Sequence, residues 1–265
     1  MCGIAGIAEL RGSGRPDPGL VASMTATLAH RGPDGSCVVE TGAAAPRLVF
    51  GLRRLGIIDL GAGARVFADE SGRIRAVCNG EIYNAPEIRR RLLARGHRFE
   101  SRCDTEVIPH LYEEEGTPFV SRLDGMFAFA LHDARRSRLV LGRDRAGEKP
   151  LYYLSRGDEL IFASEIKALL AHPGVVRAID PQALTRYLLY GYVPAPRTPF
   201  RGLRKLPAGH LLIAENGAVR LERYWDIRAF ARAGRARPRA RGEAARPRQD
   251  PLGPPDPAAL ARADP

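Results

Sequence analysis

Cysteine is scarce in this 265-residue sequence. The four present, Cys2, Cys37, Cys78 and Cys103, include no Cys-x-x-Cys pair, and no histidine spacing typical of a metal site accompanies them. This pattern excludes a disulfide framework or a cysteine-based zinc module and favours reduced thiols in the cytoplasm. We therefore expect no bound metal.

Long apolar runs and a secretory leader are absent as well. No stretch approaches the roughly 18 uninterrupted apolar residues that suggest a membrane-spanning helix. The start also lacks the basic region and long apolar core of a signal peptide. Because 45% of the residues are hydrophobic, enough for a real core, we expect a soluble cytoplasmic protein without a membrane partner.

A basic stripe interleaved with aromatic residues is also missing, although the net charge is +11. Residues 229–265 contribute +4 of this charge, from eight arginines and four acidic residues. The rest is interspersed with acidic residues, as on an ordinary solvated surface. We therefore expect no nucleic-acid partner.

Large apolar side chains nearly disappear after Trp225 and Asp226. Of the 37 residues in 229–265, 29 are Ala, Arg, Pro or Gly. Such a segment buries too little apolar surface to offset the entropy lost on ordering. We expect a folded domain over residues 1–228, including a trailing inter-domain segment, and a disordered Arg/Pro/Ala-rich tail over 229–265.

The apolar pattern of residues 1–228 predicts an α+β fold with strands paired largely antiparallel and helices outside them. Helices are expected from Pro18, over Pro86 to Arg95, and after Asp104, Ser164 and Asp180. Strands are expected at the apolar segments Cys2 to Leu10, Leu48 to Leu60 (strands around a turn), Ala76 to Cys78, Met126 to Leu131, Leu139 to Leu141, Leu151 to Leu154 and Leu160 to Ala163.

Cys2 follows the initiator methionine, so processing would leave it with a free thiol and a free α-amine. An α-amine of pKa about 7.7 to 8.0 is partly unprotonated at neutral pH and can take the thiol proton. The sequence Met-Cys alone is also compatible with a buried cysteine at the start of a strand. The remaining motifs decide between the two interpretations.

Several motifs occur in one fixed order along residues 1–228, and together they resemble one family. They are Met1-Cys2-Gly3-Ile4, His30-Arg31-Gly32-Pro33-Asp34-Gly35, Arg54-Leu55-Gly56-Ile57-Ile58-Asp59, Asn79-Gly80-Glu81-Ile82-Tyr83-Asn84, Asp104-Thr105-Glu106, Arg143-Asp144-Arg145 and Ser164-Glu165-Ile166-Lys167. The ordered set is similar to the class II glutamine amidotransferase domain of glutamine-hydrolysing asparagine synthetase. The resemblance implies the amino-terminal-nucleophile (Ntn) hydrolase fold, a four-layer αββα sandwich with two antiparallel sheets between helices.

The resemblance also implies roles for individual residues. Cys2 would attack the side-chain amide of L-glutamine, and the Asn79 side chain with the Gly80 N–H would stabilise the oxyanion. Arg54 would pair with the substrate carboxylate, and Glu81 and Asp104 with its ammonium. Backbone groups of the next segment would complete the pocket: Leu55, Gly56, Ile57 and Ile58.

Three of these positions have plainer interpretations when taken alone. Asn79-Gly80 is typical of a tight hairpin turn, and Arg54 of a surface charge. Asp104 is also a plausible helix N-cap. Arg31 and Asp34 are expected to shape a neighbouring loop rather than to touch the substrate amide.

The Ser-Gly-Gly-x-Asp-Ser phosphate loop of the family's synthetase domain is absent from this sequence. We therefore expect a truncated or frameshifted asparagine synthetase that needs no cofactor itself, since ATP and Mg would belong to the missing domain. Its expected partners are L-glutamine, an ammonia-accepting synthetase domain or subunit and, optionally, a second copy in a homodimer. Two alternatives stay open: an amidotransferase of a polysaccharide cluster, which residues 190–198 resemble, and a non-catalytic glutamine-binding module that docks on a separate synthetase.

Overall fold

The structure is a computed structural model that describes residues 2–12, 14–42 and 46–228. Contacts group the chain into two units, Met1–Asp226 and Ile227–Pro265. The predicted tail, residues 229–265, lies outside the described residues. Among the described residues, no helix is long and apolar enough to cross a membrane.

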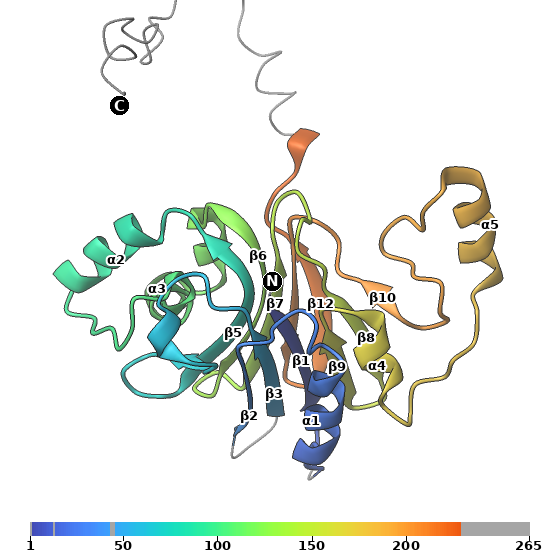
Figure 1. Cartoon of the computed structure of the whole chain (residues 1–265), viewed down its shortest axis with the longest axis horizontal. Helices are drawn as coiled ribbons and strands as arrows, with labels where there is room; N and C mark the ends of the chain where they lie inside the picture. Colours follow the sequence, from blue (N-terminus) through green and yellow to red (C-terminus); the bar gives the residue numbers. More distant parts are fainter. Residues whose placement is uncertain (1, 13, 43–45, 229–265) are drawn as a thin grey trace, which may run out of the picture. The chain divides into compact units, whose positions relative to one another are not determined.

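Two antiparallel sheets form the centre of the first unit (Figure 1). The first has the strand order β10-β8-β9-β1-β3-β2, and the second has the order β12-β11-β7-β6-β5-β4. The strands of the first sheet are β1 (Gly3–Glu9), β2 (Gly35–Thr41), β3 (Arg47–Arg54), β8 (Tyr152–Arg156), β9 (Glu159–Ala163) and β10 (Arg204–Lys205). Those of the second are β4 (Phe67–Ala68), β5 (Ile74–Ile82), β6 (Gly125–Asp133), β7 (Arg138–Arg143), β11 (His210–Glu215) and β12 (Ala218–Arg223).

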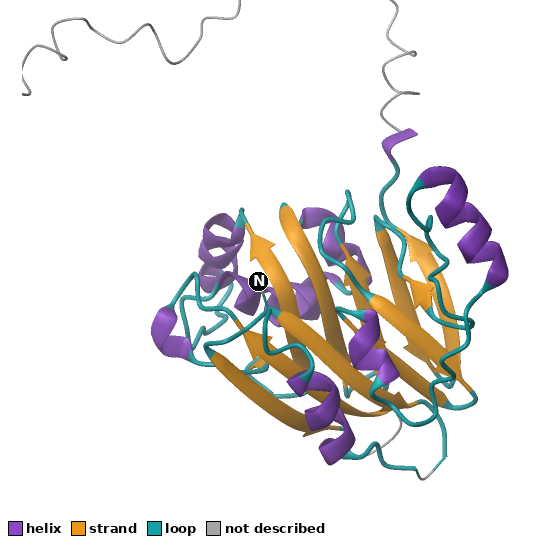
Figure 2. Ribbon diagram, turned by 45° about the vertical axis from the view of Figure 1, so that its right-hand side comes forward, coloured by secondary structure: helices purple, strands orange, loops and turns teal. Residues whose placement is uncertain are grey.

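Helices lie on the outer sides of the strands (Figure 2). The described helices are α1 (Pro18–Ala26), α2 (Ala85–Ala94), α3 (Val107–Glu115), α4 (Ile166–Leu170) and α5 (Pro181–Tyr190), with 3-10 turns η1 (Leu60–Ala62), η2 (Asp104–Glu106) and η3 (Thr117–Arg122). Helices α1 and α4 share an apolar cluster with β1 and β9, whereas α2 and α3 share one with β5 and β6.

A third apolar cluster lies between the two sheets. Ile4 and Phe50 of the first sheet meet Val77, Ala130 and Leu141 of the second there, all nearly inaccessible to solvent. The layers are thus helix, sheet, sheet, helix, which confirms the expected αββα sandwich. Strand β1 is buried on both faces because helices cover one face and the second sheet covers the other, and this explains its unbroken apolar sequence.

Most of the predicted elements are present, but two expectations are wrong. Residues Arg47–Arg54 form the single strand β3, and the expected turn and second strand before Leu60 are replaced by a loop leading into η1. Asn79-Gly80 forms no turn, since β5 continues straight through it to Ile82 and pairs with β6 along its whole length. Tertiary pairing with β6 overrides the local turn preference of the dipeptide.

Candidate active site

One pocket collects most of the residues singled out in the sequence. It is lined by Cys2, Leu52, Arg54, Leu55, Ile57, Ile58, Gly63, Arg65, Phe67, Cys78, Asn79, Gly80, Glu81, Cys103, Asp104, Thr105, Met126 and Lys149. The lining combines cationic and anionic side chains, as a pocket for a zwitterionic amino acid requires. Gly56 is the one predicted site residue outside this lining.

Strand register places Cys2 at the pocket. Gly3 lies opposite Arg53 on β3, so the preceding residue reaches the segment that follows Arg54. The Leu55 N–H donates to the Cys2 Sγ at 3.4 Å, and the thiol lies 3.7 Å from the Leu55 carbonyl oxygen. The backbone of Leu55 therefore holds the sulfur at one place and offers a donor to a thiolate.

The start of β1 is anchored from two sides. Ser164 accepts the Ile4 N–H at 3.0 Å and donates its own N–H to the Ile4 carbonyl oxygen at 2.8 Å. The Arg31 Nε donates to the Cys2 carbonyl oxygen at 3.0 Å, and the Arg31 Nη1 donates to Glu165 at 2.8 Å. Arg31 thus contacts the backbone of Cys2, beyond the loop-shaping role expected for it.

Glu165 remains ionised in this network. Burial opposes its ionisation, but hydrogen bonds from Arg31, His30 and Lys167 outweigh that cost and lower its pKa to about 2. A carboxylate that is charged at neutral pH therefore holds Arg31 against the Cys2 backbone.

The Asn79 side chain lies in the pocket wall with unused hydrogen-bonding capacity. It is 0% exposed, and neither its Oδ1 nor its Nδ2 has a hydrogen-bond partner among the described residues. A buried amide without hydrogen-bond partners lowers the stability of the folded state, so native folds contain few such groups. Its position in the Cys2 pocket suits a donor reserved for a ligand.

The Gly80 N–H is directed to the free edge of β5. Gly80 lies opposite Phe127 on β6. The Phe127 N–H donates to the Asp144 carboxylate, and the Phe127 carbonyl oxygen accepts the Asp144 N–H. Both groups of Phe127 therefore point to the side of β6 away from β5. The two residues therefore form a non-hydrogen-bonded pair whose backbone groups point apart. On that edge of β5, β4 pairs only with Arg75 and Ala76, so it stops short of Gly80.

Glycine is required at position 80 by the neighbouring strand. A Cβ atom there would lie 2.2 Å from the Met126 carbonyl oxygen, far closer than a non-bonded contact permits. Packing of β5 against β6 therefore constrains this position to glycine independently of any ligand.

Arg54 is a buried cation at the end of β3, with 8% of its surface exposed. Its Nη2 donates to the carbonyl oxygens of Ile58 at 2.9 Å and Asp59 at 2.6 Å. These bonds fold the segment after β3 back over the guanidinium group. The interpretation of Arg54 as a surface charge is wrong.

Asp34 also holds the segment that follows β3, through Gly56. Its carboxylate accepts the Gly56 N–H at 2.8 Å, which agrees with the loop-shaping role expected for Asp34. Because the Gly56 N–H is used in this way, Gly56 supports the loop, whereas Ile57 and Ile58 line the pocket.

Asp104 is the first residue of η2, and its carboxylate accepts the Ile82 N–H at 2.6 Å. The residue that caps α3 is Glu106, and that of η2 is Cys103, so the N-cap interpretation of Asp104 is wrong. Burial raises the pKa of Asp104, and the nearby Glu81 carboxylate raises it further. Two carboxylates close together in a partly dry site favour a cationic ligand.

The sequence did not point to several other lining residues, above all Cys78, Cys103 and Lys149. Burial raises the pKa of Cys78 well above its ordinary value, with the Asp104 charge adding to the effect, and burial also raises the pKa of Cys103. Both side chains therefore stay protonated thiols and compete poorly with Cys2 as nucleophiles. The only sequence signal for Cys78 and Cys103 is that each directly precedes a predicted site residue.

The αββα sandwich with a cysteine before its central strand defines the class of Ntn amidotransferases. The sequence profile of the glutamine amidotransferase domain matches residues 1–225, and the chain belongs to this family as a class II glutamine amidotransferase domain. This confirms the family resemblance and the enzyme class expected from the motifs.

Curated relatives include asparagine synthetases described as glutamine-hydrolysing. The chain is 36% identical to asparagine synthetase 3 of Bacillus subtilis over 86% of this chain and 37% of the relative, and 38% identical to synthetase 2 of that organism over 80% and 28%. It thus spans about a third of the length of these relatives.

Among solved structures, the glutamine phosphoribosylpyrophosphate amidotransferase of Bacillus subtilis, complexed with ADP and GMP, matches with a TM-score of 0.58 and 19% identity. The match covers 84% of this chain and 49% of that one. At this identity, the similarity supports the fold alone.

Proposed function

We propose that this chain hydrolyses L-glutamine to glutamate and ammonia, with Cys2 as the nucleophile. The observation that carries the proposal is the meeting, in one pocket, of the Cys2 thiol with the buried Asn79 amide that has no partner. A pocket that merely bound glutamine would not need a thiol beside an unused amide donor. Hydrolysis uses both groups.

The reaction proceeds in two balanced halves. The Cys2 sulfur forms a bond to the amide carbon while the thiol proton passes to the α-amine, and the amine then protonates the departing nitrogen as ammonia. Water next attacks the resulting thioester, and breaking the C–S bond releases glutamate and the free thiol. No cofactor is needed for either half.

The oxyanion formed in each half lies between Asn79 and Gly80 in this proposal. The Asn79 amide and the Gly80 N–H, which the register directs to the free edge of β5, are the two donors. Removing one donor of this kind typically costs about 2.7 to 4 kcal/mol of transition-state stabilisation.

The other end of glutamine is held by charge. Arg54 pairs with its carboxylate, and Glu81 and Asp104 pair with its ammonium, because these side chains line the same pocket and a guanidinium group matches a carboxylate well. Ile57 and Ile58 close the pocket next to them.

We further propose that the ammonia goes to a synthetase domain or subunit that amidates aspartate with ATP and Mg. The relatives described as glutamine-hydrolysing asparagine synthetases support this acceptor. The four cysteines, all free, fit a cytoplasmic location. A homodimer remains an expectation that light scattering on the purified chain would test.

An electrophilic glutamine analogue tests the proposed nucleophile. An analogue with a diazoketone in place of the amide should add once per chain, and peptide mass spectrometry should find the adduct on Cys2 with Met1 removed. Cys37→Ala, which alters a cysteine outside the pocket, should react as the wild type does. An adduct on Cys78 or Cys103, or an active chain that retains Met1, would contradict the mechanism.

A further inference from the structure

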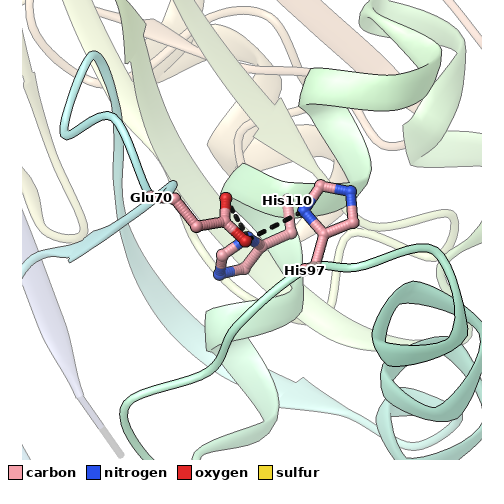
Figure 3. A group of neighbouring side chains, drawn as sticks. All are labelled: Glu70, His97 and His110. Carbon is pink, nitrogen blue, oxygen red and sulfur yellow. Dashed lines mark hydrogen bonds and ion pairs between the residues drawn. The ribbon is translucent and has the colours of Figure 1, made fainter.

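Three side chains outside the amidotransferase pocket converge near α3 (Figure 3). Glu70 comes from the turn between β4 and β5, His97 from the segment after α2, and His110 from α3 itself. One potential ligand atom from each lies within 4.8 Å of the other two. Figure 3 shows the Glu70 carboxylate pointing toward the two imidazole rings.

His110 is the least ordinary member of this cluster. Only 1% of the residue is exposed, and neither ring nitrogen has a hydrogen-bond partner among the described residues. Its Nδ1 lies 3.3 Å from the Glu70 Oε2, but outside hydrogen-bonding geometry. A buried imidazole whose two ring nitrogens are unpartnered can serve as a metal ligand.

The separations of Glu70 from the two histidines are close to those between ligand atoms around a metal ion. The His97 Nδ1 lies 3.2 Å from the Glu70 Oε1, a separation close to that of the His110 contact. Two ligand atoms at about 2.1 Å from a tetrahedral zinc ion lie about 3.4 Å apart. The His97 Nε2 lies 3.4 Å from Glu114, as in sites where a carboxylate orients the ligating imidazole.

Glu70 forms no ion pair with an arginine or a lysine among the described residues, so its carboxylate is available to a metal ion. Glu113 is paired with Arg135 at 2.7 Å, and Glu114 is paired with Arg95. The contacts of Glu70 among the described residues are instead the Arg98 N–H at 2.7 Å and the two histidines.

We propose that Glu70, His97 and His110 form a zinc site with a structural role. Two imidazoles and one carboxylate favour zinc over magnesium or calcium, which prefer oxygen ligands alone. Because Glu70 is about a third exposed, water can complete a four-coordinate shell. The ion would join three segments that are separate in the sequence, one of them the helix that directly follows η2 and Asp104. This replaces the expectation of no metal.

Metal titration of the full chain, stripped with a chelator, tests the site. Calorimetry with zinc chloride should show one equivalent that disappears in Glu70→Gln and in His97→Gln. His210→Gln, which changes a histidine on β11, is the matched control and should bind as the wild type does. Glu70 and His97 are the informative positions because His110 is fully packed and its variants risk unfolding.

Cobalt and heat distinguish this site from the pocket thiols. The cobalt complex should show d–d bands without a sulfur-to-cobalt charge-transfer band. Zinc at a hundredfold excess over its Kd should raise the wild-type Tm by roughly 5 °C and leave that of Glu70→Gln unchanged. Absence of binding, binding that survives both variants, or a thiolate band would each overturn the proposal.

Discussion

Three cysteines line the pocket, and the proposed mechanism uses only Cys2. The backbone of Leu55 faces the Cys2 sulfur, whereas burial keeps Cys78 and Cys103 as neutral thiols. The position of Cys2 just before β1 gives it a rigid support on one side and the pocket on the other. The proposed difference between the three thiols therefore follows from burial and from backbone donors. The residue type, which is the same for all three, does not provide it.

Arg54→Ala should raise KM for glutamine steeply with a smaller effect on kcat. Removing one partner of a buried, hydrogen-bonded charge pair commonly costs about 2 to 5 kcal/mol, or at least about 30-fold in affinity. Steady-state kinetics and calorimetry with glutamine measure the change.

The control for this variant is Arg53→Ala, since the neighbouring Arg53 bonds to the Thr25 carbonyl oxygen on another side of β3. It should leave KM near the wild-type value. Equal effects of the two variants would remove Arg54 from the substrate site.

Asp104→Asn should raise KM by roughly 10-fold to 150-fold, because a hydrogen bond to a charged group is worth about 1.5 to 3 kcal/mol. The wild-type KM should also rise on acidification, because the raised pKa of Asp104 makes it lose its charge at a higher pH than an ordinary aspartate would. A pH series of KM for both proteins measures this. A wild-type and a variant profile of the same shape would argue against Asp104 as the ammonium partner.

The charged residues of the candidate site were predictable from the sequence, but their burial and their hydrogen-bond partners were not. Arg54 and Asp104 were identified only through the ordered motifs, because each has a common alternative role taken alone. The Cys103 contact of Arg54 and the Ile82 contact of Asp104 join residues that lie 49 and 22 positions apart in the chain.

At the scale of secondary-structure elements, the start of β1 depends on α4 and the segment before it. Ser164 and Glu165 precede α4. Ser164 bonds to the Ile4 backbone, and Glu165 holds Arg31 against the Cys2 carbonyl oxygen. Neither side chain lines the pocket. Both are therefore positioning residues in the proposed mechanism.

Glu165→Gln should lower kcat while leaving KM for glutamine nearly unchanged, since it loosens Cys2 rather than the charged end of the pocket. It should also lower stability by about 1 to 2 kcal/mol near neutral pH, a value discounted for partial exposure. With a folded-state pKa of about 2, this contribution is present above the ordinary value near 4.5 and is lost as the pH falls toward 2.

Thermal unfolding of the wild type and of Glu165→Gln between pH 6 and pH 3 tests the direction of this pH dependence. The difference in Tm should narrow as the solution becomes more acidic. A difference that widens at low pH would show that Glu165 is not the ionised anchor of Arg31.

Gly80→Ala should destabilise the fold by roughly 1 to 3 kcal/mol, the usual cost of overpacking. The new methyl group meets the Met126 carbonyl oxygen and forces β5 and β6 apart, so kcat should fall as well. Urea unfolding and steady-state kinetics measure the two effects. Gly61→Ala is the control, because in the 3-10 turn η1 an added Cβ would approach only the Asp59 side chain, at 3.9 Å. Equal stability of the two variants would contradict the packing argument.

Elements with strong apolar periodicity were predictable, and those set by pairing were not. Helix α2 and strands β6 and β9 match their apolar patterns closely. Strand β5 continues through Asn79-Gly80 because β6 pairs with it. Strands β2 and β12 have mixed polar sequences, and each is fixed by pairing with a neighbouring strand. The apolar run of β11 was not among the expected strands.

At the scale of the whole folded unit, the pocket lies where the two sheets meet. Cys2 and Arg54 come from the first sheet, Asn79 from the second, and Asp104 from the turn before α3. The cluster of Glu70, His97 and His110 is also assembled from three separate segments, so no local residue spacing in the sequence predicts it. The layer architecture was predictable from the resemblance, but this cluster was not.

The most direct test of the account is product formation from glutamine by the purified chain. The wild type should release glutamate and ammonia in a 1:1 ratio without ATP or aspartate, and Cys37→Ala should do the same. Cys2→Ala should bind glutamine but release neither product, because the charged contacts remain when the nucleophile is lost. Continued turnover by Cys2→Ala, or a processed wild type that binds glutamine without hydrolysing it, would contradict the account.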